Sequence, residues 1–320
     1  MTPEPQPAVS VVVATRNRSA LLPRLFEALA RQTTSAFDLT IVDDGSTDAT
    51  AELLPQLAAN APFPTTVITG EGRGPAVGRN LGWRSATAPV IAFTDDDCVP
   101  TDDWLTAGLA VLEHADIVVG RTRPNPDQVD RLGPYSRTLS VSETRFFQTC
   151  NAFYRRADLE RHGGFDEDFD RPGGEDTDLA LRVLGDGHRV DAFADEALVY
   201  HDISESRLRD ALRVASRWTG VARLIAKHPE LRRRDLHHGL FWQPSHPWLI
   251  LAWLGIAGTT RDRRAVLLGV PWCWHTTTRH IPSVIRRKDK LRHLPGYFLL
   301  DTAEVVAMVR GSVRAETLVL

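Results

Sequence analysis

The 320-residue sequence has only three cysteines, and no two of them form a CxxC pair. This odd number of widely spaced thiols (Cys98, Cys150 and Cys273) argues against a disulfide framework or a zinc site, and it favours a reducing compartment. The N-terminus, MTPEPQPAVS, has neither a basic segment nor an apolar run, so we expect no secretory signal. The signatures GxGxxG and GxxxxGK[ST] are also missing, which argues against a Rossmann dehydrogenase or a P-loop enzyme.

Apolar runs long enough to span a bilayer are missing as well. WLILAWLGIAG (Trp248–Gly258) and AVLLGVPWCW (Ala265–Trp274) have eleven and ten residues, whereas a spanning helix needs about 20. The arginines and tryptophans around them are typical of helices that lie in the membrane interface. A buried, Trp-rich helical subdomain would show the same composition, so both interpretations stay open.

The net charge of −3 conceals two regions of opposite sign. Residues 1–206 hold 18 Lys and Arg against 33 Asp and Glu, whereas residues 207–320 hold 20 against 8. Six of the eight tryptophans lie in the second region. We therefore expect an acidic domain over residues 1–205 and a basic, Trp-rich helical region over 206–320 that contacts an acceptor or a membrane surface. No helix-turn-helix, zinc or RNA-binding motif accompanies the basic charge, which argues against a nucleic-acid partner.

Short apolar runs alternate with helical stretches in the first region. VSVVVA (Val9–Ala14) is typical of a strand that is buried on both faces, and the leucines after it have helical spacing. The same pattern predicts strands at Leu39–Val42, Thr65–Thr69 and Val90–Phe93, and helices near Ala49–Ala58 and Pro75–Ser85. The alternation predicts an α/β fold with a Rossmann-like, mostly parallel sheet and helices on both faces. Ligands of such sheets bind beyond the carboxyl ends of the strands.

The pattern is less regular beyond Asp116. ADIVVG and RFFQTCNAFYRR each predict a strand, and Arg121–Val141 between them predicts a long mobile loop. EDTDLALRVLGDG predicts a helix that ends at Gly185 or Gly187. HRVDAFADEALVYH predicts two short strands ending at His201, and Arg207–Ala226 has helical spacing.

Three consecutive aspartates, Asp95, Asp96 and Asp97, follow the predicted strand Val90–Phe93. Carboxylates this close repel one another and raise each other's pKa. A divalent cation would remove the repulsion, because Mg²⁺ and Mn²⁺ prefer oxygen ligands and are held by one or two carboxylates plus substrate phosphates. A solvated surface loop can also carry such a run, so the motif alone leaves both options open.

Two further aspartates follow the strand at Leu39–Val42. In VDDGSTDAT, Ser46 or Asp48 is suited to cap the next helix, which leaves Asp43 and Asp44 to accept from a nucleobase or a ribose hydroxyl. The residue two positions before the second aspartate is Val42, which excludes the nucleophile of a haloacid-dehalogenase-like phosphatase.

Two glycine-rich segments lead into helices. GEGRGPAVGRNLGW places Arg79 and Asn80 where they can reach a phosphate or a ribose. In GGFDEDFDRPGGEDTDLALR, Glu175 and Asp176 open a helix, whose dipole favours an ionised carboxylate that can accept a proton. Simple charge complementation of the helix end is the alternative. His201 ends a strand, where it is either structural or completes a metal site.

Eight motifs occur in this order: VVVATRNR, IVDDGSTDAT, GPAVGRNLGW, FTDDDCVP, NAFYRR, GGFDEDF, GEDTDLALR and VYH. Over residues 9–205 the series resembles the family 2 glycosyltransferases, which have the GT-A fold. The resemblance implies a catalytic domain over 1–205 that transfers a sugar, with inversion, from a UDP-, GDP- or dTDP-sugar to a hydroxyl of a glycan, lipid-linked glycan or natural product. It also implies a Mn²⁺ or Mg²⁺ cofactor. The cysteines favour a cytoplasmic location, and because helical membrane-associated extensions are common in such enzymes, residues 206–320 either contact the cytoplasmic face of a membrane or form a soluble helical subdomain.

The same resemblance implies residue roles. Asp97 would ligate the metal, Asp95 would share it or touch the ribose, and His201 would complete the metal site. Asp96, between the two other aspartates, would belong to the donor-binding residues. Thr15, Arg16, Asp43 and Asp44 would lie near the nucleoside, and Arg79 and Asn80 under the nucleotide. Asp176, next to Glu175, matches the catalytic base. Phe93-Thr94 departs slightly from the usual Phe-Leu before the aspartates.

Two alternatives remain from the residues. A nucleotidyltransferase acting on a sugar phosphate is also α/β and metal-dependent, but its usual glycine-rich opening with a following lysine is missing near Val9–Arg18. A non-catalytic paralogue that binds a sugar nucleotide or a membrane would not need to keep every acidic position. The sugar, the nucleobase and the acceptor are not specified by these motifs.

Overall fold

The computed structural model describes residues 6–169, 171–185, 187, 189–204, 207–282, 285–286 and 288–320. The chain divides into two compact units. Unit 1 comprises Met1–Val129 and Thr138–Asp202, and unit 2 comprises Asp130–Arg137 and Ile203–Leu320. The short segment Asp130–Arg137, which lies in the sequence between the two parts of unit 1, therefore belongs to unit 2.

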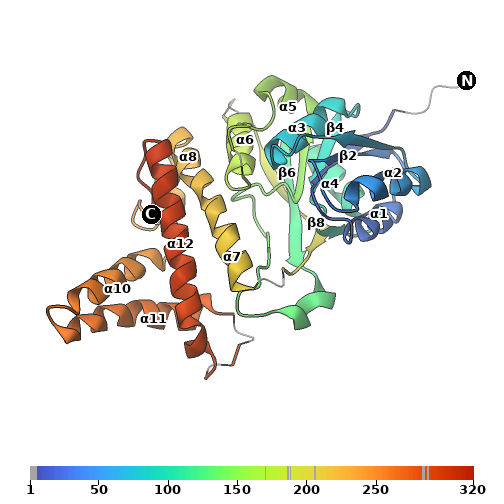
Figure 1. Cartoon of the computed structure of the whole chain (residues 1–320). Helices are drawn as coiled ribbons and strands as arrows, with labels where there is room; N and C mark the ends of the chain where they lie inside the picture. Colours follow the sequence, from blue (N-terminus) through green and yellow to red (C-terminus); the bar gives the residue numbers. More distant parts are fainter. Residues whose placement is uncertain are drawn as a thin grey trace, which may run out of the picture. The chain divides into compact units, whose positions relative to one another are not determined.

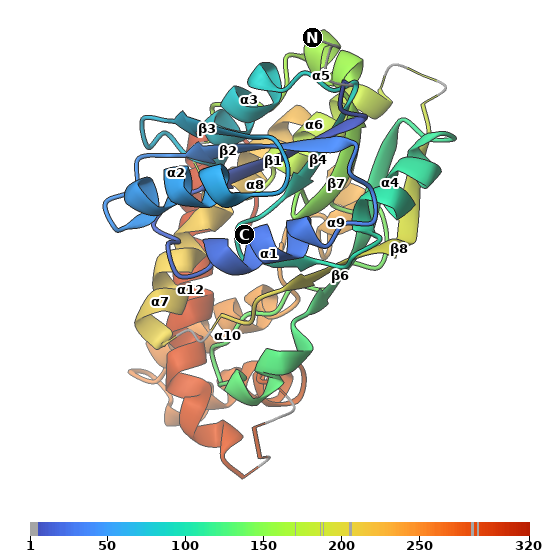
Figure 2. The same ribbon diagram turned by 90° about the vertical axis from the view of Figure 1, so that its right-hand side faces the viewer.

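Unit 1 is built on one eight-stranded mixed sheet with the order β3-β2-β1-β4-β7-β6-β8-β5. Its strands are β1 (Val9–Thr15), β2 (Phe37–Asp43), β3 (Thr65–Thr69), β4 (Val90–Thr94), β5 (Cys98–Pro100), β6 (Ile117–Pro124), β7 (Asn151–Arg155) and β8 (Asp191–His201). The first four strands pair in parallel, as do β6 and β8, whereas the β4–β7, β6–β7 and β5–β8 pairs are antiparallel. Figure 2 shows β1 to β4 side by side. The predicted α/β fold is confirmed.

Helices cover both faces of this sheet. They are α1 (Leu22–Ala30), α2 (Thr50–Asn60), α3 (Pro75–Ser85), α4 (Trp104–Leu112), α5 (Arg156–His162) and α6 (Glu175–Leu184). Alternate residues of β1 enter different cores: Val11 packs with side chains of α1, α2 and α4, and Val12 packs with side chains of α3, α5 and α6. Burial on both faces explains the unbroken valine run of this strand.

Helix α3 lies unusually close to β1. A Cβ atom built on Gly82 would come within 2.5 Å of Val12 Cγ1. Pro75 occupies the first turn of the helix, where its missing N–H has no intrahelical acceptor to lose. The glycine and the proline together fix the helix against the sheet, with Arg79 on its buried side.

Three sequence expectations differ from the structure. HRVDAFADEALVYH contains one strand, β8, because both halves pair with β6 across an irregularity in register. The loop expected over Arg121–Val141 instead starts with the end of β6 and a 3₁₀ helix, η1 (Pro126–Arg131), and Val141 bridges back to Thr122. The strand expected from Arg145 begins only at Asn151. Tertiary pairing, which periodicity does not encode, decides each case.

Unit 2 is helical among its described residues. Its helices are α7 (Leu208–Ala215), η2 (Ser216–Trp218), α8 (Thr219–Lys227), α9 (Leu231–Asp235), α10 (His246–Gly258), η3 (Arg263–Gly269), α11 (Val270–His275), η4 (Thr276–His280), η5 (Lys290–His293) and α12 (Leu294–Arg314). The helix expected over Arg207–Ala226 corresponds to the run from α7 to α8. Two buried carboxylates on α12 accept from tryptophan indoles, Asp301 from Trp272 and Glu304 from Trp218. No helix within the described part of the chain is long and apolar enough to cross a membrane.

Candidate active site

The carboxyl ends of β1, β2 and β4 form one rim of the sheet in unit 1. Thr15 ends β1, Asp43 ends β2, and Asp95 follows β4 directly. This placement follows from parallel pairing, which lines up the strand ends. The short strand β5 then turns back and pairs with β8, and its register sets Cys98 opposite His201. The motif FTDDDCVP and the strand end VYH therefore meet, as the metal hypothesis requires.

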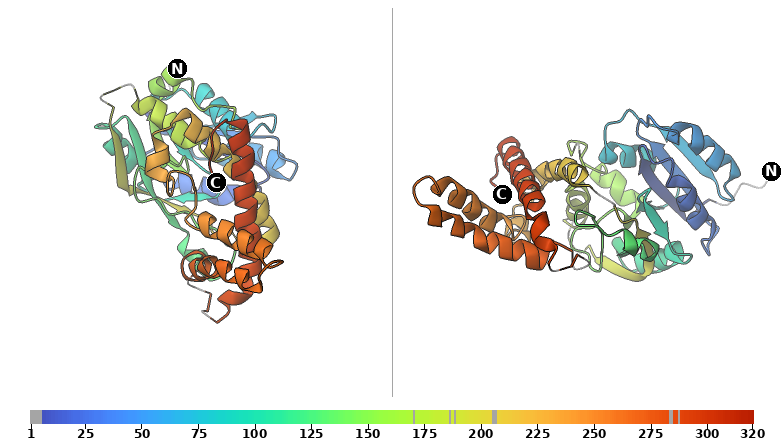
Figure 3. Two further views of the ribbon diagram at one scale, coloured as in Figure 1. Left: turned by 90° about the vertical axis from the view of Figure 1, so that its left-hand side faces the viewer. Right: turned by 60° about the horizontal axis from the view of Figure 1, so that its bottom comes forward.

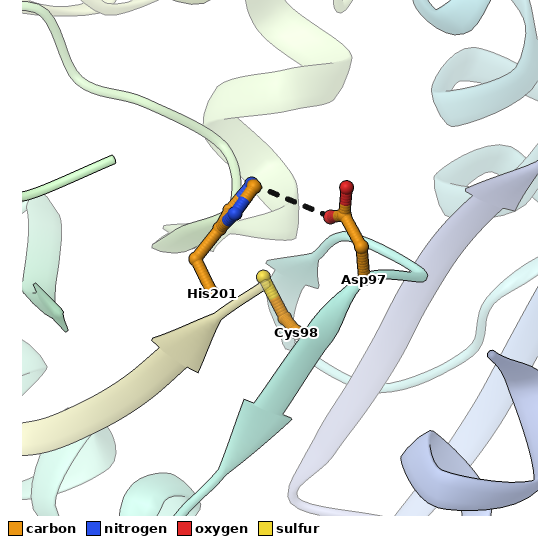
Figure 4. A group of neighbouring side chains, drawn as sticks. All are labelled: Asp97, Cys98 and His201. Atoms are coloured by element: carbon orange, nitrogen blue, oxygen red, sulfur yellow. Dashed lines mark ion pairs between the residues drawn. The ribbon is translucent and has the colours of Figure 1, made fainter. Parts of the chain in front are cut away.

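Asp97, Cys98 and His201 form a cluster of possible metal ligands (Figure 4). One ligand atom from each side chain lies within 4.8 Å of the other two. The closest charged contact joins His201 Nε2 and Asp97 Oδ1 at 3.4 Å. Burial raises the pKa of the Cys98 thiol well above its ordinary value, so this sulfur stays protonated and is a poor ligand for a hard cation.

The imidazole of His201 is oriented by its second nitrogen. Nδ1 lies 2.9 Å from the carbonyl oxygen of Asp202, to which it donates as an N–H. With Nδ1 engaged in this way, Nε2 is the ring nitrogen that faces Asp97, which is the nitrogen that a metal ion between the two residues would use. The residues therefore fit a divalent cation held by Asp97 and His201, with Asp95 nearby in the sequence.

Arg79 joins the aspartate loop to the start of α6. Its Nη2 donates to Asp95 Oδ1 at 3.0 Å, and its Nη1 donates to Glu175 Oε1 at 3.2 Å and lies 3.6 Å from Asp176 Oδ1. Burial opposes the charge of the guanidinium, but these three carboxylates outweigh it and raise the pKa of Arg79. One cation is thus fixed among three carboxylates.

Asp176 is held in place by Thr149. The backbone N–H of Thr149 donates to Oδ2 at 3.1 Å, and its hydroxyl donates to Oδ1 at 2.9 Å. Burial and the neighbouring Glu175 raise the pKa of Asp176 to about 7, against the opposing effects of Arg79 and Thr149. A carboxylate with a pKa near neutrality is suited to general-base catalysis.

Glu175 is more enclosed than Asp176. The Glu175 side chain is 3% exposed, against 21% for Asp176. Both its oxygens are engaged, Oε1 by Arg79 and Oε2 by the backbone N–H of Gly173. Both oxygens of Asp176 are engaged as well, so the exposure separates the two, and Asp176 is the one with surface left for a substrate.

Asp96 points away from its two neighbours. Its Oδ2 accepts from the hydroxyl of Thr15 at 2.7 Å, and its Oδ1 lies 3.5 Å from Arg18 Nε. The side chain is 9% exposed, against 30% for Asp95 and 22% for Asp97. Burial and Asp97 raise the pKa of Asp96 to about 7, although Arg18 and Thr15 act in the opposite direction. The aspartate run therefore presents Asp95 and Asp97 outward and ties Asp96 to β1.

Asp44 anchors the glycine-rich loop before α3. Its carboxylate accepts from the backbone N–H groups of Gly72, Arg73 and Gly74 at 2.7–3.1 Å. Arg16 contacts the same loop by donating to the carbonyl oxygen of Gly72. Asp43 accepts from the backbone N–H of Ser46 at 2.9 Å and so shapes the turn after β2. Contacts of these residues with a nucleoside stay predictions.

Asn80 uses both ends of its amide within the protein. Its Nδ2 donates to the Phe165 carbonyl oxygen and to Glu167, while its Oδ1 accepts from the Trp83 indole and the Phe165 backbone N–H. The residue thereby ties α3 to the segment after α5. The expected contact of Asn80 with the nucleotide stays a prediction, and Arg79 is the member of the pair that faces the carboxylates.

Sequence reasoning missed two supporting residues, Thr149 and Arg18. Thr149 lies in a segment that was predicted to be a strand, and only the tertiary structure brings its donors to Asp176. Arg18 belongs to the motif VVVATRNR, so the sequence indicated that it lies near the rim. The sequence did not indicate that Arg18 pairs with Asp96.

Two models of known protein families match the chain. The profile described as Glycosyl transferase family 2 matches residues 10–166, and the one described as Glycosyl transferase family group 2 matches residues 90–278. The second match spans more than half of the sequence. The chain belongs to glycosyltransferase family 2. This confirms the resemblance seen in the eight motifs.

Curated relatives of this family 2 member are of similar type. Validoxylamine A glucosyltransferase of Streptomyces hygroscopicus subsp. jinggangensis is 29% identical over 275 residues, which cover 74% of this chain and 63% of that protein. The succinoglycan biosynthesis protein ExoM of Rhizobium meliloti is 32% identical over 178 residues, covering 52% of this chain and 57% of the relative. The chain thus spans about 60% of the length of these relatives.

Solved structures share the fold of this family 2 member. The mannosyltransferase PcManGT from Pyrobaculum calidifontis, solved with GDP-Man and Mn²⁺, aligns with a TM-score of 0.59 and 20% identity, covering 97% of this chain and 88% of that one. Residues 1–349 of S. aureus TarS, solved with UDP, align with a TM-score of 0.53 and 19% identity, covering 97% and 92%. The GT-A fold expected from the sequence is confirmed.

Proposed function

We propose that this protein transfers a sugar from a nucleoside-diphosphate sugar to an acceptor hydroxyl, with inversion at the anomeric carbon. The observation that carries the proposal is the position of Arg79 among Asp95, Glu175 and Asp176. It brings a permanent cation, which suits a diphosphate, and a carboxylate of near-neutral pKa to one place on the rim. Transfer of a sugar from a diphosphate to a hydroxyl needs both: the cation offsets the charge of the leaving diphosphate, and the carboxylate takes the proton of the hydroxyl.

The relatives support the sugar-donor class. PcManGT was solved with GDP-Man, and S. aureus TarS was solved with UDP and with UDP-GlcNAc. The name of validoxylamine A glucosyltransferase describes transfer of a glucosyl group. We infer a UDP-, GDP- or dTDP-sugar as the donor, and a glycan, lipid-linked glycan or natural product as the acceptor.

Mn²⁺ or Mg²⁺ is part of this proposal. Asp97 and His201 would hold the ion, and Asp95 would share it or contact the ribose. The fit rests on the partial exposure of Asp97 and on Nε2 of His201, which faces Asp97 Oδ1 at 3.4 Å while Nδ1 is engaged by a backbone carbonyl. When bound, such an ion acts as a Lewis acid that offsets the negative charge of the diphosphate. The Mn²⁺ in PcManGT supports the choice of metal.

Asp176 is the proposed general base. The acceptor hydroxyl gives its proton to the Asp176 carboxylate as its oxygen bonds to the anomeric carbon. The bond from that carbon to the diphosphate breaks, and its electron pair leaves with the nucleoside diphosphate. Because the acceptor attacks from the face opposite the leaving group, one displacement inverts the configuration. Arg79 lies where it can offset the charge of the diphosphate.

Glu175 has a positioning role in this scheme. It is buried, and its two oxygens are engaged by Arg79 and by the Gly173 N–H. From the sequence, Glu175 was a candidate catalytic residue together with Asp176. We propose that Glu175 instead sets the position of the Arg79 guanidinium.

We also propose that the protein works in the cytoplasm in contact with the membrane surface. The excess of basic residues over 207–320 supports attraction to anionic lipid headgroups. The same composition gives no support for nucleic-acid binding, since no motif of that kind accompanies it.

The central test is a screen for the sugar donor. The purified chain is mixed with Mn²⁺ and UDP-, GDP- or dTDP-sugars, and thermal unfolding is followed. A ligand at a hundredfold excess over its Kd stabilises the folded state by about 2.7 kcal/mol. Product analysis with a hydroxyl acceptor then separates the chemistries: a glycosyltransferase releases a nucleoside diphosphate, and a nucleotidyltransferase releases pyrophosphate. Stabilisation by no nucleotide sugar, or release of pyrophosphate, would refute the proposal.

A further inference from the structure

Large apolar side chains are distributed very unevenly over the surface. Among the described residues of unit 1, only Val129 and Val190 are exposed large apolar residues. Eight such residues lie within 27 positions of unit 2: Trp248, Leu254, Ile256, Val266, Leu267, Leu268, Val270 and Trp274. Exposed large apolar side chains gathered in so short a stretch point to an interaction site.

These residues belong to one element of unit 2, a hairpin of residues 246–275 made of α10, η3 and α11. Figure 1 and Figure 3 show its two arms side by side, in orange. The arms approach closely, since a Cβ atom on Gly255 would lie 2.6 Å from the Ala265 carbonyl oxygen. The base of the hairpin contributes Leu249, Ala252 and Trp272 to a core with α12. Trp253 packs against that core, but no residue between 254 and 271 belongs to it or packs against it, so the outer half of the hairpin lies outside this core.

Apolar exposure occurs on more than one side of the hairpin. Leu254 and Ile256 are 58% and 55% exposed, yet two residues correspond to about 200° around a helix. Val266, Leu267 and Leu268 on the other arm are consecutive and all exposed. A partner helix would cover one stripe of residues along the hairpin, whereas lipid acyl chains contact an inserted element on several sides. The distribution therefore favours lipid over a flat protein surface.

The turn of the hairpin carries positive charge. Arg261, Arg263 and Arg264 are exposed, and Asp262 accepts from the backbone N–H of Arg264 as a helix cap. If two copies of the chain met turn to turn, their arginines would repel each other. An arginine near a lipid phosphate is instead attracted by the opposite charge. Arginines at the turn also keep it at headgroup depth. With α10 only about 20 Å long, the hairpin is too short to cross the roughly 30 Å hydrocarbon layer.

We infer that the hairpin of residues 246–275 is the element that inserts into the interface of an anionic bilayer. Its apolar side chains enter the acyl boundary while Arg261, Arg263 and Arg264 contact lipid phosphates. This inference rests on the proposed membrane contact and names its structural basis. It does not depend on the chemistry of sugar transfer.

The test is flotation of the full chain with vesicles of phosphatidylcholine alone, or with one third phosphatidylglycerol. We expect the wild type to float with the anionic vesicles. Leu254→Ser with Leu267→Ser, both at exposed positions, should lower the partition coefficient at least about tenfold. The matched control, Leu299→Ser with Val313→Ser on α12, removes side chains of similar exposure, 52% and 76%, and should float like the wild type.

The charge contribution is tested in the same way. Arg263→Gln with Arg264→Gln should weaken binding to anionic vesicles roughly 25-fold, because each arginine near such a surface contributes about 1 kcal/mol. Arg310→Gln with Arg314→Gln on α12 removes equal charge outside the hairpin and should have a much smaller effect. Unchanged thermal shifts with a nucleoside diphosphate and Mn²⁺ would show that each variant is folded.

Three outcomes would overturn the inference. If the wild type does not float, both the membrane contact and the hairpin assignment fail. If the wild type floats and the hairpin variants float equally well, the membrane contact stands and the assignment fails. If sedimentation without lipid shows a dimer that the Leu254→Ser and Leu267→Ser variant dissociates, and no vesicle binds, the surface belongs to a second copy of the chain. None of these results bears on donor binding or transfer.

Discussion

Nε2 of His201 lies 3.4 Å from Oδ1 of Asp97 because β5 and β8 pair in a register that sets Cys98 opposite His201. Two motifs far apart in the sequence thus offer one nitrogen and one oxygen to the same point. The pairing is antiparallel and involves a strand of only three residues. The candidate metal site therefore depends on a small part of the sheet.

The first prediction separates the three aspartates. Asp97→Asn should weaken Mn²⁺ binding in the presence of a nucleoside diphosphate by at least about tenfold, since a ligand is lost. Asp96→Asn should leave the Mn²⁺ affinity nearly unchanged, because that side chain faces Thr15 and Arg18. Titration calorimetry measures both. Equal affinities of the wild type and Asp97→Asn would remove Asp97 from the ligand set.

The second prediction concerns the base. Asp176→Asn should retain nucleoside-diphosphate binding and lose transfer by roughly 10² or more, which is the contribution expected of a general base. Glu175→Gln keeps a hydrogen-bond acceptor for Arg79 and should lose less transfer, with a weaker affinity for the sugar donor as its main effect. Single-turnover assays with binding measured separately distinguish the two. A normal rate for Asp176→Asn would show that another group takes the proton.

The third prediction is a pH profile. Burial and Glu175 raise the pKa of Asp176 to about 7. A base acts in its deprotonated form, so kcat/KM should increase with pH up to about 7 and level off above it. Thr149→Val removes the hydroxyl donor that stabilises the carboxylate and should shift this midpoint to higher pH. A profile that is flat between pH 5 and 8 in both proteins would contradict the assignment.

The fourth prediction tests the close packing of α3 on β1. Gly82→Ala should lower the free energy of unfolding by about 1–3 kcal/mol, because its Cβ would lie 2.5 Å from Val12. Gly133→Ala is a suitable control, since its Cβ would lie 3.6 Å from Ser136 Oγ, an ordinary van der Waals distance. Denaturant unfolding measures both. Equal stabilities would mean that α3 shifts away from the sheet without cost.

Much of the early part of the fold could be predicted from the sequence because β1, β2 and β4 are buried on both faces. VSVVVA is apolar except for Ser10, VIAF is apolar throughout, and the predicted Thr65–Thr69 strand and Pro75–Ser85 helix have the bounds that the structure gives them. Beyond Asp116 the strands pair in both directions and with an irregularity in register, so the local pattern predicts little of the pairing. The two halves of β8 looked like separate strands because nothing in the sequence shows that both pair with β6.

The candidate site was predictable in its location but not in its orientation. The position of the acidic motifs after strands placed them on one rim. Sequence alone did not show that the Asp96 side chain bonds to Thr15, or that Thr149 donates to Asp176. It also did not show that the Asn80 amide forms its hydrogen bonds with the segment around Phe165. Each of these depends on which side of a loop a side chain faces, and hydrophobic periodicity carries no such information.

The three hydrogen bonds from the glycine-rich loop to Asp44 have a thermodynamic consequence. Residues 72–74 are ordered before any ligand arrives, although two of them are glycines, which have the most conformational entropy to lose. Ordering one residue opposes binding by about 1–2 kcal/mol. Because the loop already loses this conformational entropy when the protein folds, its backbone does not have to be ordered again when a ligand binds. The affinity for a ligand that contacts the loop is therefore not reduced by that entropy loss.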